Sequence, residues 1–61
     1  MERYIREYAN AKKNLISTNN EMNEERKIKA IERINKVLKM REKEFITIDE
    51  TILEILNCME D

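Results

Sequence analysis

The chain has no glycine, proline, histidine or tryptophan among its 61 residues, and it has a single cysteine, Cys58. The lack of glycine excludes the glycine-rich loops that bind phosphate groups, and the lack of histidine removes the commonest general base and metal ligand. One cysteine makes neither an internal disulfide nor a thiolate zinc site. Cys58 and Ser17 also have no histidine to activate them as nucleophiles. We therefore expect no enzyme activity, metal, cofactor or small-molecule substrate.

Long apolar runs are also missing from the sequence. The longest are pairs such as Leu15-Ile16 and Ile52-Leu53, far short of the roughly 20 residues of a membrane span. Residues 1–7 carry charges where a signal peptide needs an apolar run. We expect neither membrane insertion nor export, and place the protein in the cytoplasm, where one cysteine stays reduced. The frequent Ile, Lys, Asn, Glu and Met residues, all encoded by A/T-rich codons, point to a low-GC bacterium or a phage.

The residues that are present favour helices, since 41% are hydrophobic and 41% are charged. Two Thr-x-x-Glu segments, at Thr18–Glu21 and at Thr47–Glu50, have the spacing of a capping box, which starts a helix. Residues 1–61 are expected to form one small helical domain. Its predicted helices cover about residues 2–17, 20–44 and 48–60.

Apolar residues recur at steps of three and four in each predicted helix, so they share one helical face. The candidates for the core or for self-association are Tyr4, Tyr8, Leu15, Ile31, Ile34, Leu38, Phe45, Ile52, Ile55 and Met59. Ala30 and Val37 widen the stripe of the second helix, whereas Lys27 and Arg41 interrupt its heptad spacing. Cys58 is interpreted as a small residue on the flank of the third helix.

The predicted fold class is all-α, a helical hairpin plus a third short helix. The connection at residues 17–20 is short enough for an antiparallel hairpin, with Asn19 or Asn20 in the left-handed conformation that glycine usually adopts after a helix. Because so short a chain buries only a small core, we expect homo-oligomerisation, most simply a dimer, to complete the fold. One alternative stays open: the β-branched residues 45–48 favour an extended segment or a strand that pairs across the dimer.

Charge is distributed unevenly along the chain. Residues 1–44 hold all 12 basic and 8 acidic residues, a net charge of +4, whereas residues 45–61 hold 5 acidic residues and no basic one. On the second helix the basic side chains form a stripe roughly opposite the predicted core face, with a methionine beside them. The resulting partner-binding candidates are Arg26, Lys29, Arg33, Lys36, Met40 and Lys43.

These features favour a small non-catalytic protein-binding module, a regulator, inhibitor or adaptor that uses a helical surface to bind another protein. A basic stripe also suits a phosphate backbone, so a nucleic-acid-associated transcription regulator is the alternative. No aromatic residue lies between the basic residues and Glu25 and Glu32 border them, which counts against that alternative. A structural subunit of a larger assembly is the second alternative.

Overall fold

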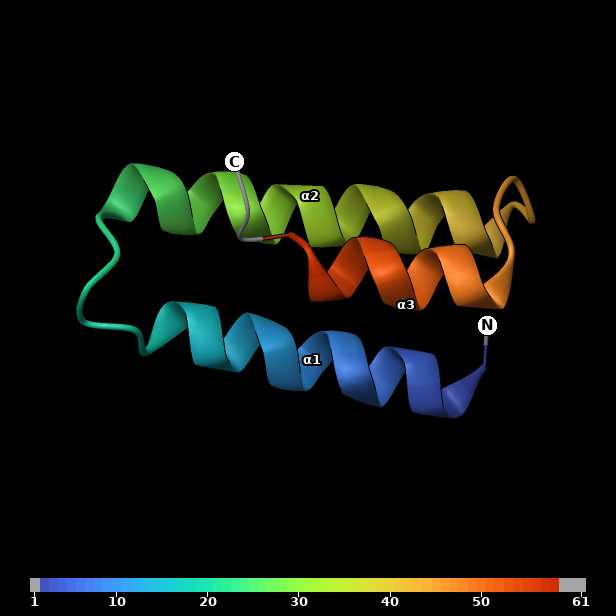
Figure 1. Cartoon of the computed structure of the whole chain (residues 1–61), viewed down its shortest axis with the longest axis horizontal. Coiled ribbons are helices and arrows are strands. Elements are labelled where there is room, and N and C mark those ends of the chain that lie inside the picture. The colour runs from blue at the N-terminus through green and yellow to red at the C-terminus, as the bar shows by residue number, and fades with distance from the viewer. Residues whose placement is uncertain (1, 59–61) are drawn as a thin grey trace.

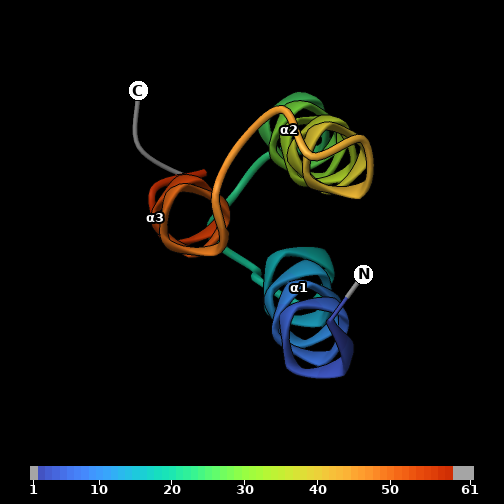
Figure 2. The same ribbon diagram turned by 90° about the vertical axis from the view of Figure 1, so that its right-hand side faces the viewer.

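The structure, a computed structural model, describes residues 2–58, and these residues form three α-helices and no strand. The helices are α1 (Arg3–Ser17), α2 (Glu24–Glu42) and α3 (Ile48–Leu56). Both α1 and α3 run antiparallel to α2, and therefore parallel to each other (Figure 1). Seen end-on, the three helices stand at the corners of a triangle (Figure 2). The all-α prediction is confirmed, and the strand alternative is wrong, because residues 45–48 bend and then begin α3.

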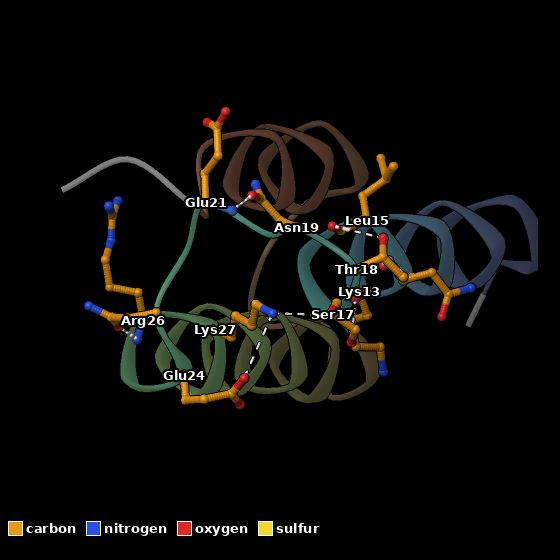
Figure 3. A network of polar contacts seen from close by, with 11 residues as sticks. Lys13, Leu15, Ser17, Thr18, Asn19, Glu21, Glu24, Arg26 and Lys27 are labelled. Atoms are coloured by element: carbon orange, nitrogen blue, oxygen red, sulfur yellow. Dashed lines mark hydrogen bonds and ion pairs between the residues drawn. The ribbon is translucent and has the colours of Figure 1, made fainter.

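The connection between α1 and α2 is longer than predicted, so α2 begins at Glu24 and not near residue 20. Thr18 does not cap α2, because its hydroxyl donates to the carbonyl oxygen of Asn14, 2.9 Å away, at the end of α1. The side chain of Asn19 accepts a hydrogen bond of 2.8 Å from the backbone N–H of Glu21 within this connection (Figure 3). Asn23 caps α2 instead, accepting from the backbone N–H of Arg26 at 2.8 Å. The predicted capping box at Thr18 is therefore wrong.

The end of α2 has the left-handed residue that was predicted at the end of α1. Within residues 2–58, the non-glycine residue with a positive φ is Glu44, at 61°. The N–H of Glu44 donates to the carbonyl of Arg41, and the N–H of Phe45 donates to the carbonyl of Met40, both at 2.9 Å. This pair of bonds is a Schellman motif, which satisfies the last carbonyls of a helix. The prediction for Asn19 or Asn20 is wrong.

The start of α3 follows the sequence pattern closely. The Thr47 hydroxyl accepts from the N–H of Glu50, and the Glu50 carboxylate accepts from the N–H of Thr47, each at 3.1 Å. The predicted capping box at Thr47 is therefore confirmed. The helix ends at Leu56, with Asn57 as its C-cap, earlier than predicted. Residues 59 and 60 of the predicted helix lie outside the described residues.

The core is built from side chains of all three helices. The buried residues are Ile5, Ala9, Ile16, Ala30, Ile34, Val37, Thr51, Ile55 and Cys58. The Thr51 hydroxyl donates to the carbonyl of Thr47 at 2.8 Å, so its burial leaves no unsatisfied polar group. Cys58 is only 5% exposed. The interpretation of Cys58 as a flank residue is therefore wrong.

The buried faces of the helices are rotated from the predicted stripes. In α2 the small residues Ala30 and Val37 are buried with Ile34, while Ile31 and Leu38 lie partly buried at the edge of the core. Buried alanines allow close approach of the helices, so the largest apolar side chains need not mark the interior.

Several core candidates consequently lie outside the core of the single chain. Tyr4, Leu15 and Phe45 are 55%, 65% and 71% exposed. Ile55 is fully buried, as is Ile34, whereas Tyr8 and Ile52 are partly buried. Met59 lies outside the described residues. The self-association part of the prediction for the exposed residues stays a prediction.

The two cations that interrupt the heptad spacing of α2 lie at the two ends of the bundle. Lys27 and Arg41 have side chains that are 15% and 18% exposed. The ammonium group of Lys27 donates to the carbonyl of Ser17 at 3.2 Å and so joins the start of α2 to the end of α1 (Figure 3). The alkyl chains of Lys27 and Arg41 cover the two ends of the core, while their charged groups make hydrogen bonds at its edge.

Candidate functional site

The basic stripe of α2 lies on the flank of the helix that faces α3. Arg33 shows this most directly, because its Nη2 lies 3.6 Å from Oε2 of Glu54 on α3. The stripe was predicted roughly opposite the core. That position is wrong, because the buried face of α2 centres on Ala30, Ile34 and Val37, not on Ile31, Ile34 and Leu38. The stripe therefore borders the contact with a neighbouring helix.

A hollow of about 270 Å³ lies at this border, between α2 and α3. One wall is basic and comes from α2, the opposite wall is acidic and comes from α3, and the floor is apolar. The basic wall consists of Arg33 and Lys36, and the acidic wall of Glu50 and Glu54. The apolar floor consists of Val37, Met40 and Ile46. We call this site the α2/α3 hollow. Three of the six predicted partner-binding residues, Arg33, Lys36 and Met40, are brought together there.

Local hydrogen bonds hold the walls of the α2/α3 hollow in place. The Glu50 carboxylate is oriented by the capping bond from the N–H of Thr47. The carbonyl of Ile46 accepts a hydrogen bond of 2.7 Å from Nη1 of Arg41, which fixes the α2–α3 connection at the end of the hollow. These bonds therefore fix the positions of Glu50 and Ile46 at the hollow.

The other three predicted residues do not line the hollow. Lys29 lies 3.3 Å from the carboxylate of Glu25, one turn earlier on α2, as the i, i+4 spacing implies. Arg26 and Lys43 are exposed towards the two ends of the helix. They extend the basic surface along α2 but do not contribute to the concave part.

The acidic wall and, apart from Met40, the apolar floor of the hollow were not predicted from the sequence. Residues 45–61 were seen to be acidic, but nothing in the sequence placed Glu50 and Glu54 opposite Arg33. Val37 was predicted to widen the apolar stripe of the second helix, and Ile46 lay in the segment 45–48 that favoured an extended conformation. Their meeting is a tertiary feature, since it depends on the rotation of α3 against α2.

A second polar cluster ties the helix termini together at one end of the bundle and has a structural role. Nη2 of Arg41 donates to Oε1 of Glu2 at 2.9 Å, while Nη1 of the same guanidinium reaches the loop carbonyl of Ile46. The hydrogen bond from Arg41 lowers the pKa of Glu2 below its ordinary value of 4.5. The cluster therefore joins the start of α1, the end of α2 and the connection to α3.

Cys58 lies inside the core, just after the end of α3. Burial raises the pKa of its thiol, and the charges of Lys12 and Arg33 offset only part of that effect. A buried thiol of this kind is a poor nucleophile. Among residues 2–58 no three or more Cys, Asp and Glu side chains are grouped so that they could hold a metal ion. None of the helices in this range has the length and apolar character needed to cross a membrane.

The size and lining of the α2/α3 hollow decide what it accommodates. Its volume of about 270 Å³ lies just below the range of about 300–1,000 Å³ that is usual for small-molecule sites. The apolar floor accepts an apolar group, and the two walls favour a basic and an acidic neighbour on either side of it. Comparisons of the chain with protein-family models, with curated proteins and with solved structures found no significant match.

Proposed function

We propose that the chain is a small non-catalytic protein-binding module, a regulator, inhibitor or adaptor, which takes an apolar side chain of its partner into the α2/α3 hollow. The observation that carries this proposal is the lining of the hollow. It combines the predicted contact residues Arg33 and Lys36 of α2 with two carboxylates of α3 around an apolar floor, and this floor includes the third predicted contact residue, Met40. A buried apolar anchor surrounded by polar groups is the usual arrangement of an interface hot spot.

The proposed partner carries acidic groups on its surface, next to the apolar side chain that enters the hollow. Lys29, Lys36 and Lys43 form an exposed basic edge on the α2 side of the hollow. Such an edge attracts acidic groups at long range, which speeds association at low salt and orients the partner. The anchor in the hollow then supplies the short-range contact and slows dissociation.

The lining supports a protein partner better than a nucleic acid. A protein partner can place its acidic groups on the lysine side of the hollow alone, whereas a phosphate backbone that follows the basic stripe has to pass beside Glu50 and Glu54, which repel it. It also has to compete with the ion pairs that Arg33 makes with Glu54 and that Lys29 makes with Glu25. No comparable observation favours a purely structural subunit.

A random peptide library displayed on phage tests the proposal. We expect peptides selected on the unmodified chain to share one large apolar residue next to Asp or Glu. They should bind at least about tenfold more weakly to Lys36→Glu, which reverses a charge at the wall of the hollow. Lys39→Glu is the matched control, because Lys39 is an exposed lysine of the same helix outside the hollow.

Two outcomes of this experiment would contradict the proposal. One is the selection of peptides without a shared apolar residue. The other is an equal loss of binding in Lys36→Glu and Lys39→Glu, which would show general charge attraction. Salt-sensitive binding of duplex DNA that is tighter than that of any selected peptide would favour the nucleic-acid alternative.

A further inference from the structure

An apolar flank of α1 is left uncovered by the bundle. Helical spacing places Tyr4, Tyr8, Ala11 and Leu15 on one side of this helix. The opposite side carries Lys13, whose ammonium group donates to Asn35 of α2 at 3.0 Å. Because that side faces α2, the apolar flank is directed to the α3 side of the molecule.

The third helix has a corresponding flank. Its side towards α2 is marked by Glu54, which pairs with Arg33. Helical spacing places Ile52 and Leu56 on the side opposite Glu54, and therefore towards α1, with Leu53 at the outer edge of that side. Since α1 and α3 are parallel neighbours (Figures 1 and 2), the two flanks form one surface, the α1/α3 face.

The α1/α3 face exposes a large apolar area. Tyr4, Leu15, Leu53 and Leu56 are between 54% and 65% exposed. These four side chains leave on the order of 400 Å² uncovered, within the range of 300–600 Å² for the largest apolar patch of a typical monomer. With the partly exposed Tyr8 and Ile52, two such faces in full contact bury at most about 1,000 Å², which is the lower limit for a specific interface.

The charges at the ends of the face are complementary. Asp49 lies in the first turn of α3. Lys12 is close to Cys58, just beyond the other end of α3, where its charge acts on the thiol. A two-fold axis through the middle of the face places the start of α3 in one copy against the end of α3 in the other. This brings Asp49 of one copy towards Lys12 of the other.

We infer that the α1/α3 face is the contact between two copies of this chain in a symmetric dimer. The area reaches the lower limit for a specific contact, the same patch serves both copies, and Asp49 meets Lys12 when the copies run antiparallel. The α2/α3 hollow lies on another side of the bundle, so each copy of the dimer keeps it open. The inference does not rest on the proposed function.

Sedimentation equilibrium between about 5 and 500 µM tests the dimer, because association depends on concentration. We expect the mass of the unmodified chain to rise to twice the monomer mass. Leu56→Lys should weaken the dimer at least about tenfold. The control is Ile28→Lys, since Ile28 is also 54% exposed but lies on α2. It should change the dissociation constant by less than about twofold.

A charge exchange tests the two-fold arrangement. Lys12→Glu and Asp49→Lys should each weaken the dimer, and the double variant should recover most of the loss. Circular dichroism of every variant shows that the helices persist. A monomer mass at all concentrations would overturn the inference, as would equal dissociation in Leu56→Lys and Ile28→Lys. If the monomeric Leu56→Lys variant binds the selected peptides as the unmodified chain does, dimerisation and peptide binding at the α2/α3 hollow are independent of each other.

Discussion

Glu44 is held in a conformation that costs energy for any residue with a Cβ atom. Its φ of 61° lies in the left-handed region, which L-residues adopt at a cost of roughly 1–2 kcal/mol. Glycine avoids that cost. It also gives the unfolded chain more conformational freedom, and this offsets about 0.4–1 kcal/mol of the stabilisation. We therefore expect Glu44→Gly to raise the free energy of unfolding by about 0.5–1 kcal/mol, measured by urea denaturation.

The effect of glycine should depend on position and not on the residue type alone. Lys39→Gly places glycine at an exposed site inside α2, where it should lower the free energy of unfolding by about 1 kcal/mol. Opposite signs for the two substitutions support the Schellman motif at the end of α2. Destabilisation by Glu44→Gly would count against the left-handed conformation of Glu44.

At the scale of the element, two threonines with the same local sequence pattern have different roles. The Thr47 hydroxyl accepts from the N–H of Glu50 and begins α3, whereas the Thr18 hydroxyl donates to a carbonyl and ends α1. Thr47→Ala should therefore cost about 1 kcal/mol of stability. Amide hydrogen exchange should increase first at residues 48–51, the opening turn of α3.

Thr18→Ala is the comparison for the capping prediction. Because Asn23 and not Thr18 caps α2, exchange in the first turn of α2 should stay as in the unmodified chain. Increased exchange at residues 24–27 in Thr18→Ala would show that the capping assignment is wrong.

At the scale of the whole molecule, the Glu2–Arg41 pair links stability to pH. The pKa of Glu2 is lowered in the folded chain by the hydrogen bond from Arg41. Its contribution is therefore present above the ordinary pKa of 4.5 and is lost as the pH falls through the lowered pKa. The midpoint temperature of unfolding should fall over that interval, and Glu2→Gln should make the fall shallower.

Arg41→Gln removes the other half of the same pair. It should flatten the pH dependence to the same extent as Glu2→Gln, because either change abolishes the hydrogen bond between the two side chains. Arg41→Gln should also lower stability at neutral pH more than Glu2→Gln, since it loses the bond to the carbonyl of Ile46 as well. Identical pH profiles of the unmodified chain and Glu2→Gln would exclude this linkage.

Two isoleucines of α2 test the position of the core. Ile34 is fully buried, while Ile28 is 54% exposed. Ile34→Ala should cost about 2–5 kcal/mol, because it removes buried methyl groups and leaves a cavity. Ile28→Ala should change stability by less than about 0.5 kcal/mol. Similar losses in thermal or urea unfolding would place the buried face of α2 elsewhere.

The sequence by itself determined the features that depend on neighbouring residues. Helical periodicity predicted three helices, and the Thr47–Glu50 pair marked the start of α3, because a capping box and a helical turn involve residues only three or four apart. The same local pattern gave a wrong prediction at Thr18. A hydroxyl can donate or accept a hydrogen bond, and the Thr18 hydroxyl donates to a carbonyl at the end of α1.

Only the tertiary structure decided which side of each helix is buried. Residues one position apart differ by about 100° around a helix, so the choice between Leu38 and Val37 depends on how three helices fit together. Ala9 and Ala30 fit where the helices approach closely, which turns the larger Tyr4 and Leu15 outwards. That rotation places Arg33 against Glu54 and forms the α2/α3 hollow. Contacts such as Glu2–Arg41, 39 residues apart, leave no local pattern by which a sequence reveals them.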